Sequence, residues 1–412
     1  MPVERDLRLI LAVQALRAFA YGFGSVILGT VLGASGLSSL QVGLVFTAML
    51  AGMALSSVVV GLLGDRAGRR RTYVVLLVLM GVTGAVFALT RFVPLLLLAA
   101  LTGTLSTDPN ESGPITSLEQ AMMAGAPRDM RSRVFGRYNA VAYLSGAVGA
   151  LAAGGSAAFR GTSATTADQR ALLVFVPIAI ACAALGSRLS TAAETARPEG
   201  AKRRAPLDRS RPIVLRLAAL FGLDSFAGGF VVQTFLVYWF ERRFGASPQA
   251  MGITFFAAGL LQAVSSVVAG RLATRLGLLN TMVFTHLPSN VLLIMVPLMP
   301  NLPLAIAVLL LRFALSQMDV PARQAYVVTM VEPEERTAAS AFTNTARYVT
   351  RPAGPLIGGA LMRFAIGAPF VVAGGLKIVY DLLLFATFRH VPEPPPEEPA
   401  ATRARREPTP GG

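Results

Sequence analysis

The chain has 412 residues, of which 54% are hydrophobic and only 14% are charged, and its mean hydropathy is +0.59. About a quarter of the residues of a soluble domain are charged, so this composition excludes one and makes the lipid bilayer the expected solvent. The formal net charge of +15 suggests nucleic acid as a partner at first sight. The basic residues alternate with apolar runs, however, and do not gather in the patch or arm that nucleic-acid binding requires.

Apolar runs of about 20 residues recur along the chain, and each is long enough to cross a hydrocarbon core as a helix. No water is available at that depth to bind free backbone groups, so each run is expected to be α-helical. The first run is too long for a signal-peptide core, and we expect it to be retained as a span. The predicted spans are about 8 to 33, 39 to 63, 73 to 90, 93 to 120, 134 to 158, 171 to 189, 212 to 240, 249 to 272, 277 to 299, 302 to 327, 337 to 363 and 367 to 389.

Basic residues cluster in every second connection between these runs, and the other connections hold few. The clusters are 66 to 71, 128 to 133, 202 to 204, and 271 to 275. By the positive-inside rule these connections are cytoplasmic, which puts both chain termini in the cytoplasm and requires an even number of spans.

A polar, basic segment at 190–211 divides the twelve spans into six and six. We expect it to be a cytoplasmic linker between an N-terminal six-helix bundle at 1–189 and a C-terminal one at 212–390. Residues 391–412 are rich in proline and are expected to be a disordered tail. The segment beginning at Gly61 is answered by one beginning at Gly270, about 209 residues later. Internal repeats with a substrate site at their interface are typical of secondary transporters.

The connection between the second and third runs has the pattern G-x-L-x-D-x-x-G-R-R/K-R/K. Its residues are Gly61, Gly64, Asp65, Gly68, Arg69, Arg70 and Arg71. The glycines permit a tight reversal, the acid can bind a helix N-terminus or an arginine, and the arginines hold the inner membrane surface.

This pattern resembles the motif of major facilitator superfamily transporters, and the resemblance extends along nearly the whole chain. It implies an all-α membrane protein of twelve transmembrane helices in two pseudo-symmetric six-helix bundles. In that superfamily the motif acts as a latch on the conformational change and does not contact substrate. The second copy has Thr274 where the first has Asp65, so only the first copy is complete.

A second glycine pattern lies in the eleventh run, at Gly354, Pro355, Gly358 and Gly359. It matches the G-P-x-x-G-G core that drug antiporters of this superfamily carry in helix five, whereas helix five of this chain has alanine in place of the proline. Small residues in membrane helices most often permit close packing, and we favour that interpretation over an antiport signature.

Ionisable residues inside the runs are the main functional signal, because a charge at the bilayer centre costs at least about 2.5 to 3.5 kcal/mol and normally faces a cavity or a partner. They are Arg17, Asp108, Glu111, Asp224, Arg312, Asp319, Arg347, Arg351, Lys377 and Asp381. The resemblance implies that helices one, four, seven and ten line the cavity, which places the first six of these residues where substrate would bind.

Asp108 and Glu111 lie three positions apart beside a proline, and a desolvated carboxyl can exchange a proton near neutral pH, as proton coupling requires. Asp319 and Arg323 are four residues apart and form either a functional pair or a structural ion pair. For Lys377 and Asp381, also four apart, we expect mutual neutralisation.

Four arginines, Arg17, Arg312, Arg347 and Arg351, either form a cationic cavity for an anionic substrate or pair across to the acids of other helices. Tyr21 and Gln233 could add hydrogen bonds to a ligand. His286, beside Pro288, is expected to be a locally satisfied polar residue at a kink rather than a proton carrier.

These features predict a secondary active transporter of a small organic molecule, working by alternating access in the bacterial inner (plasma) membrane as a monomer. Proton coupling and export are favoured. The alternatives are uptake or exchange of an organic anion and, from another class, a membrane-embedded sensor or enzyme on the same scaffold. No H-E-x-x-H, G-x-S-x-G or phosphate-loop motif is present, so we expect no enzyme, cofactor or metal.

Overall fold

A computed structural model describes residues 2–106, 113–123, 128–158, 169–190, 207–332 and 335–391, and in these ranges the regular structure is helical throughout. The first half contains α1 (Pro2–Ala34), α2 (Ser39–Ala67), α3 (Arg69–Leu89), α4 (Val93–Ala100), α5 (Pro114–Met123), α6 (Arg128–Ala158), the 3₁₀ helix η1 (Gln169–Val174) and α7 (Phe175–Gly186). The second half contains α8 (Arg211–Gly229), α9 (Gln233–Phe244), α10 (Pro248–Leu276), α11 (Leu278–Met295), the 3₁₀ helix η3 (Val296–Leu298), α12 (Leu302–Ser316), α13 (Asp319–Thr329), α14 (Arg336–Thr350), α15 (Ala353–Leu361) and α16 (Ala368–Phe388).

All twelve predicted runs contain helix. Within the described ranges, nine helical stretches are both long and apolar enough to cross a membrane. The predicted linker and tail fall mainly at 191–206 and 392–412, which lie outside the described residues.

Four runs that the sequence predicts as continuous helices are interrupted, and this corrects the prediction. The interruptions fall between α4 and α5, α8 and α9, α12 and α13, and α14 and α15. Proline explains two of them, because it lacks an N–H and its ring clashes with the preceding turn, so it is tolerated only near a helix start. Pro321 lies in the first turn of α13, and Pro352 directly precedes α15.

The two halves repeat the same turns at the same spacing. Gly68 ends α2 with φ 85°, and Gly277, which lies 209 positions later, ends α10 with φ 83°. Ser38 and Ser247, again 209 positions apart, cap the starts of these helices through their side chains. Positive φ favours glycine, so the paired glycines report a shared backbone reversal and confirm the internal repeat.

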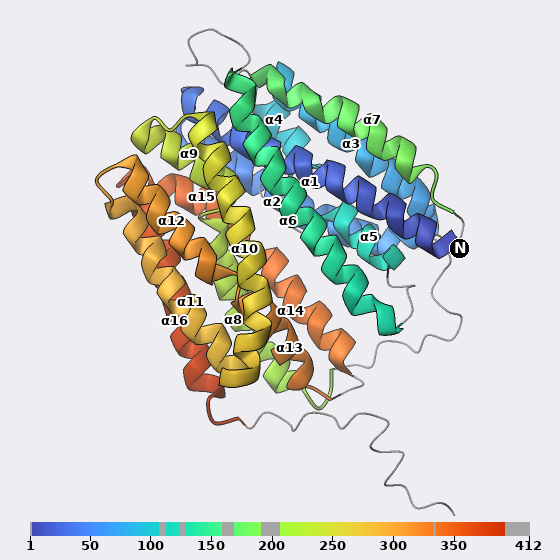
Figure 1. The fold of residues 1–412 in the computed structure, drawn as a ribbon, viewed down its shortest axis with the longest axis vertical. Coiled ribbons are helices and arrows are strands. Elements are labelled where there is room, and N and C mark those ends of the chain that lie inside the picture. Colours follow the sequence, from blue (N-terminus) through green and yellow to red (C-terminus); the bar gives the residue numbers. More distant parts are fainter. Residues whose placement is uncertain are drawn as a thin grey trace, which may run out of the picture.

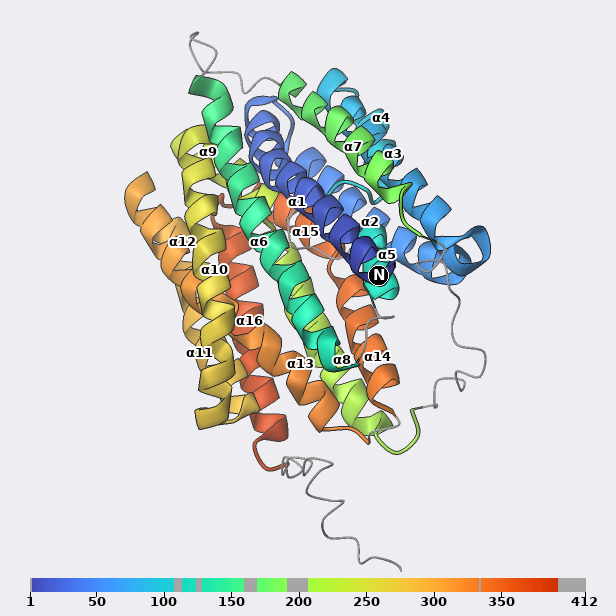
Figure 2. The same ribbon diagram turned by 45° about the vertical axis from the view of Figure 1, so that its right-hand side comes forward.

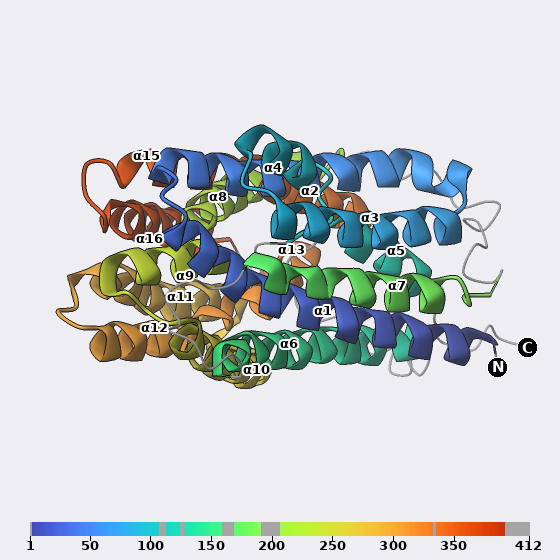
Figure 3. The ribbon, with the colours of Figure 1, turned by 90° about the horizontal axis from the view of Figure 1, so that it is seen from above.

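The helices of each half pack mainly with one another, and three helix pairs make most of the contacts between the halves. These pairs are α6 with α10, α1 with α9, and α2 with α15. Figure 1 shows α6 and α10 side by side between the blue-to-green first half and the yellow-to-red second half, and Figure 2 shows the same pair after rotation. In Figure 3, α9 lies beside α1 and α15 beside α2.

Contacts between the halves are tight near one end of the bundle. A Cβ on Gly154 of α6 would lie 2.8 Å from the Gln249 Cα of α10, whereas Gly136 and Gly270, toward the opposite ends of these helices, have open space beside them. Across α2 and α15, the Thr47 hydroxyl donates to the Pro352 carbonyl at 2.8 Å and accepts from the Leu356 amide at 3.0 Å. One side chain of the first half therefore binds the interrupted backbone between α14 and α15 of the second.

Candidate functional site

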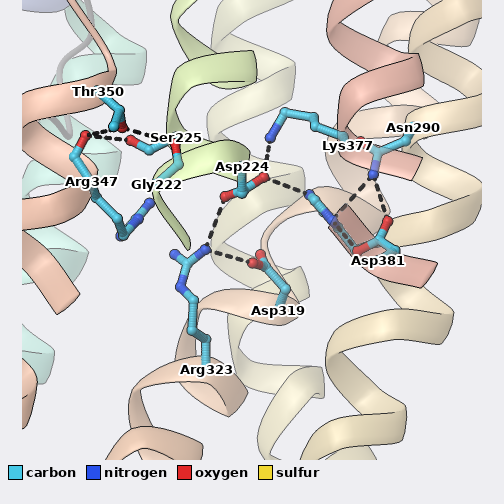
Figure 4. Close-up of polar contacts among 11 residues, drawn as sticks. Gly222, Asp224, Ser225, Asn290, Asp319, Arg323, Arg347, Thr350, Lys377 and Asp381 are labelled. Carbon is cyan, nitrogen blue, oxygen red and sulfur yellow. Dashed lines mark hydrogen bonds and ion pairs between the residues drawn. The ribbon is translucent and has the colours of Figure 1, made fainter. Parts of the chain in front are cut away.

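The second half holds a network of buried charges centred on Asp224 of α8. Its Oδ1 lies 2.5 Å from the Lys377 Nζ of α16, and its Oδ2 lies 3.3 Å from the Arg323 Nη1 of α13. The same Arg323 nitrogen lies 3.0 Å from an Asp319 carboxylate oxygen. Figure 4 shows these side chains converging from three helices. All four are buried, so each charge has exchanged water for an opposite charge, which is the condition under which buried ions persist.

The local sequence positions these groups. Asp319 begins α13, where a carboxylate is favoured by the positive end of the helix, and Arg323 follows one turn later on the same face. Asp224 lies one turn before Gly228 and Gly229, at which α8 ends. The Ser225 hydroxyl donates to the Arg347 carbonyl at 2.8 Å and thereby ties α8 to α14 (Figure 4).

His286 of α11 lies between two carboxylates. Its Nδ1 is 2.8 Å from the Asp381 Oδ1, and its Nε2 is 3.8 Å from the Asp224 Oδ1. The Asn290 amide donates to the other Asp381 oxygen at 2.8 Å. One prediction is therefore wrong: Lys377 and Asp381 do not neutralise each other but bind Asp224 and His286. His286 has the expected neighbour in its own helix, the Asn290 amide nitrogen 3.1 Å from Nδ1, but it also faces carboxylates on α8 and α16. A prediction made within single helices could not find these partners.

Two arginines beside this network have no carboxylate partner within the described chain. Arg312 of α12 and Arg347 of α14 both interact electrostatically with Asp224 and Asp319, yet each has a buried Nε without a hydrogen-bond partner. In Figure 4 the Arg347 guanidinium points toward that of Arg323, another cation. Arg351, which caps the C-terminus of α14, is half-buried.

The first half holds a separate buried pair. Arg17 of α1 lies 2.6 Å from Glu119 of α5, and the side chains are 3% and 0% exposed. The hydroxyl of Tyr73 donates to the other Glu119 oxygen at 2.7 Å, and Tyr138 also donates to this carboxylate. Arg17 is thus neutralised within its own half, which argues against its place in a cationic cavity.

Sequence reasoning missed Glu119 because it lies at the predicted end of helix four. Its apolar neighbours, Leu118, Met122 and Met123, were an available signal that the helix continues past it.

Two predicted ligand donors are occupied by protein groups. The Tyr21 hydroxyl donates to the Thr104 carbonyl at 2.7 Å, in the non-helical stretch after α4. The Gln233 amide donates to the Ser25 hydroxyl at 2.7 Å and links α9 to α1. Both residues therefore stabilise the helix framework in this conformation.

The contacts of several predicted residues are not described by the structure. Asp108 and Glu111 lie outside the described residues, as do the side chain of Asp65 and the surroundings of Gly61 and Gly64 in the motif that begins at Gly61. The backbone of the motif is described: α2 continues to Ala67, Gly68 makes the reversal, and Arg69 and Arg70 begin α3.

The glycines of α15 pack against two different helices. A Cβ on Gly354 would lie 2.5 Å from the Gly229 carbonyl carbon of α8, and one on Gly359 would lie 2.3 Å from the Ser39 carbonyl oxygen of α2. Gly358 faces Phe230 at ordinary contact distance, and Pro355 presents its carbonyl to Gly43 of α2. These contacts are the close packing that small residues permit.

The sequence matches the Major Facilitator Superfamily at residues 10–311 and again at 217–411. The chain belongs to this superfamily. It is also 27% identical over 422 residues to the "Uncharacterized membrane protein YJR124C" of Saccharomyces cerevisiae, a match that covers 93% of this chain and 94% of the yeast protein.

Solved transporter structures share the fold at low sequence identity. The nucleoside transporter NupG has a TM-score of 0.73 at 12% identity, covering 93% of this chain and 99% of that one. A D-xylose-proton symporter has a TM-score of 0.71 at 16% identity, with 93% and 98% covered. An inward-facing bacterial homologue of the human lysosomal transporter Spinster has a TM-score of 0.68 at 14% identity, with 93% and 95% covered. The protein is a multi-pass membrane protein with the transporter fold of its superfamily and is not an enzyme.

Proposed function

We propose that the protein is a proton-coupled secondary transporter that exports a small organic molecule by alternating access. The bundles at 1–189 and 212–390 are its two moving bodies, joined by the linker at 190–211. It works as a monomer in the bacterial inner (plasma) membrane. By the positive-inside prediction, the end at which the halves touch faces outward, so this conformation opens toward the cytoplasm.

The observation that carries the proposal is the buried charge network around Asp224. Buried ionisable groups in a membrane domain mark substrate and proton pathways. The network joins α8 and α13, which belong to the predicted cavity-lining helices, to α11 and α16, which do not. A change in the charge of one member therefore alters ion pairs that several helices share.

Purified protein in vesicles with an imposed pH gradient tests proton coupling. The substrate panel contains uridine and D-xylose, because solved neighbours are named for a nucleoside and for xylose, together with ethidium and benzoate. We expect flux of one class to follow the gradient, and Asp224→Asn, Asp108→Asn or Glu111→Gln to weaken it at least about tenfold. Asp208→Asn, at an exposed carboxylate, is the matched control. Flux that ignores the gradient in the unaltered protein would remove proton coupling.

Uptake or exchange of an organic anion is the second candidate, favoured by Arg312 and Arg347, whose buried Nε atoms have no hydrogen-bond partner. A ligand that binds only the folded protein raises its melting temperature. Benzoate should then stabilise the protein more than benzamide or benzylamine, and Arg347→Gln should abolish the difference, while exposed Arg363→Gln should not. Equal shifts with the three ligands would exclude this candidate.

A further inference from the structure

We propose that His286 is the site at which the transported proton is held, between Asp381 and Asp224. This inference rests on the proton coupling proposed above and deepens it, because it assigns the proton to a helix pair, α11 and α16, outside the four predicted cavity-lining helices.

The geometry of the imidazole carries the inference. A neutral imidazole has one N–H and one acceptor nitrogen, whereas a protonated ring donates from both nitrogens. Both His286 nitrogens face carboxylate oxygens, at 2.8 Å for Asp381 and at 3.8 Å for Asp224. With its proton on Nδ1, a neutral ring would direct the Nε2 lone pair at the Asp224 carboxylate, which is repulsive. A second proton, on Nε2, converts this contact into an attraction.

The surroundings exclude water from this site. His286, Asp224 and Asp381 are 5%, 4% and 0% exposed. Asn290 occupies the second Asp381 oxygen, so the carboxylate is held in place by α11 itself. From the elements packed on α11, Asp224 on α8 and Asp381 and Tyr380 on α16 lie against the ring. The other charges of the network act on Asp224 or Asp319: Lys377 on α16, Arg323 on α13 and Arg312 on α12.

Protonation of His286 can alter contacts between helices, because His286 and Lys377 approach the same carboxylate oxygen of Asp224. Lys377 and His286 approach the same Asp224 oxygen, Oδ1, while Arg323 binds Oδ2. When Nε2 gains a proton, His286 competes with Lys377 for Oδ1, and when it loses the proton Lys377 holds Asp224 alone. Protonation of His286 thus weakens the ion pair between α16 and α8 and strengthens the contact between α11 and α8. Both contacts are made by Asp224, which also binds Arg323 of α13.

Nuclear magnetic resonance of the full chain in lipid nanodiscs tests the site without a substrate. The sequence has two histidines, and exposed His390 is the internal control, so ¹⁵N-histidine labelling with His390→Gln assigns both signals. At pH 7 we expect the His286 signals to show protons on both ring nitrogens. Asp381→Asn, which keeps the shape of the side chain, should convert this ring to the neutral form. A neutral His286 ring at pH 7, or one that Asp381→Asn leaves unchanged, would overturn the assignment.

Vesicle flux separates this inference from the proposed function. His286→Gln should lose the dependence of flux on the pH gradient but keep exchange of labelled for unlabelled substrate, while His390→Gln should keep both. If His286→Gln retains gradient-driven flux, the proton is held elsewhere and proton-coupled transport still stands. If the unaltered protein shows no gradient dependence, the coupling proposal fails, and the assignment of the transported proton to His286 fails with it.

Discussion

At the residue scale, the Arg17–Glu119 pair shows how a buried charge is tolerated in the first half. Removal of one member of a buried ion pair costs about 3–5 kcal/mol, because the other charge stays desolvated, whereas removal of both members is often close to neutral. We expect Glu119→Gln to lower the melting temperature in detergent, and Arg17→Met combined with Glu119→Gln to restore most of it. A double variant less stable than both single variants would contradict this account of the pair.

Glu335 lies outside the membrane-spanning segments, and its hydrogen bonds predict how the stability of the protein depends on pH. Its carboxylate accepts the amides of Asp208, Arg209 and Ser210 at 2.8, 3.0 and 2.9 Å, just before α8 begins. A hydrogen bond from the Ser210 side chain, followed by these amides, lowers the pKa of Glu335 from 4.5 to about 2. A lowered pKa in the folded state stabilises the fold above pH 4.5, and this contribution is lost as the pH falls from 4.5 toward 2.

Thermal melts across this pH range test the Glu335 contact. Glu335→Gln should lower the melting temperature at pH 7 and flatten its fall between pH 4.5 and 2, because the variant has no carboxylate left to protonate. Exposed Glu332→Gln is the matched control and should behave like the unaltered protein. If both variants keep the full acid dependence, these three amides do not stabilise the ionised form of Glu335.

At the element scale, α15 packs on helices of both halves. Gly359→Ala would place a methyl group 2.3 Å from the Ser39 carbonyl oxygen, a backbone atom that cannot rotate away. We expect this change to separate α15 from α2 and to lower the melting temperature by several degrees. Gly375→Ala on α16, where nothing lies within 4 Å, should be neutral. Equal melting temperatures for the two variants would show that the α2–α15 contact contributes no stability.

The sequence predicts the positions of the helices well, because length and apolarity dominate within a bilayer and act locally. The sequence does not predict features that depend on contacts between helices far apart in the chain. The gap between α14 and α15 is stabilised by Thr47 of α2, which is 305 residues from Pro352 in sequence. The partners of Arg17 and Lys377 likewise lie on other helices, 102 and 153 residues away. A reading of one helix at a time could identify such charges but could not pair them.

At the scale of the whole molecule, alternating access requires that the two halves rock about the central charges. Cys182 is the only cysteine and is buried, so a Cys182→Ala background permits paired spin labels. One pair, Ala34→Cys with Arg242→Cys, spans the halves near the end where they touch, and a second pair, Arg71→Cys with Arg275→Cys, spans the other end; all four positions are exposed.

Double electron–electron resonance on these two pairs in lipid nanodiscs, at pH 5 and pH 8, shows whether the two ends of the molecule open and close in opposition. We predict that the two distance distributions change in opposite directions, with the first pair moving apart as the second pair comes together. Distances that stay fixed at both ends, or that lengthen or shorten together, would contradict alternating access in this protein.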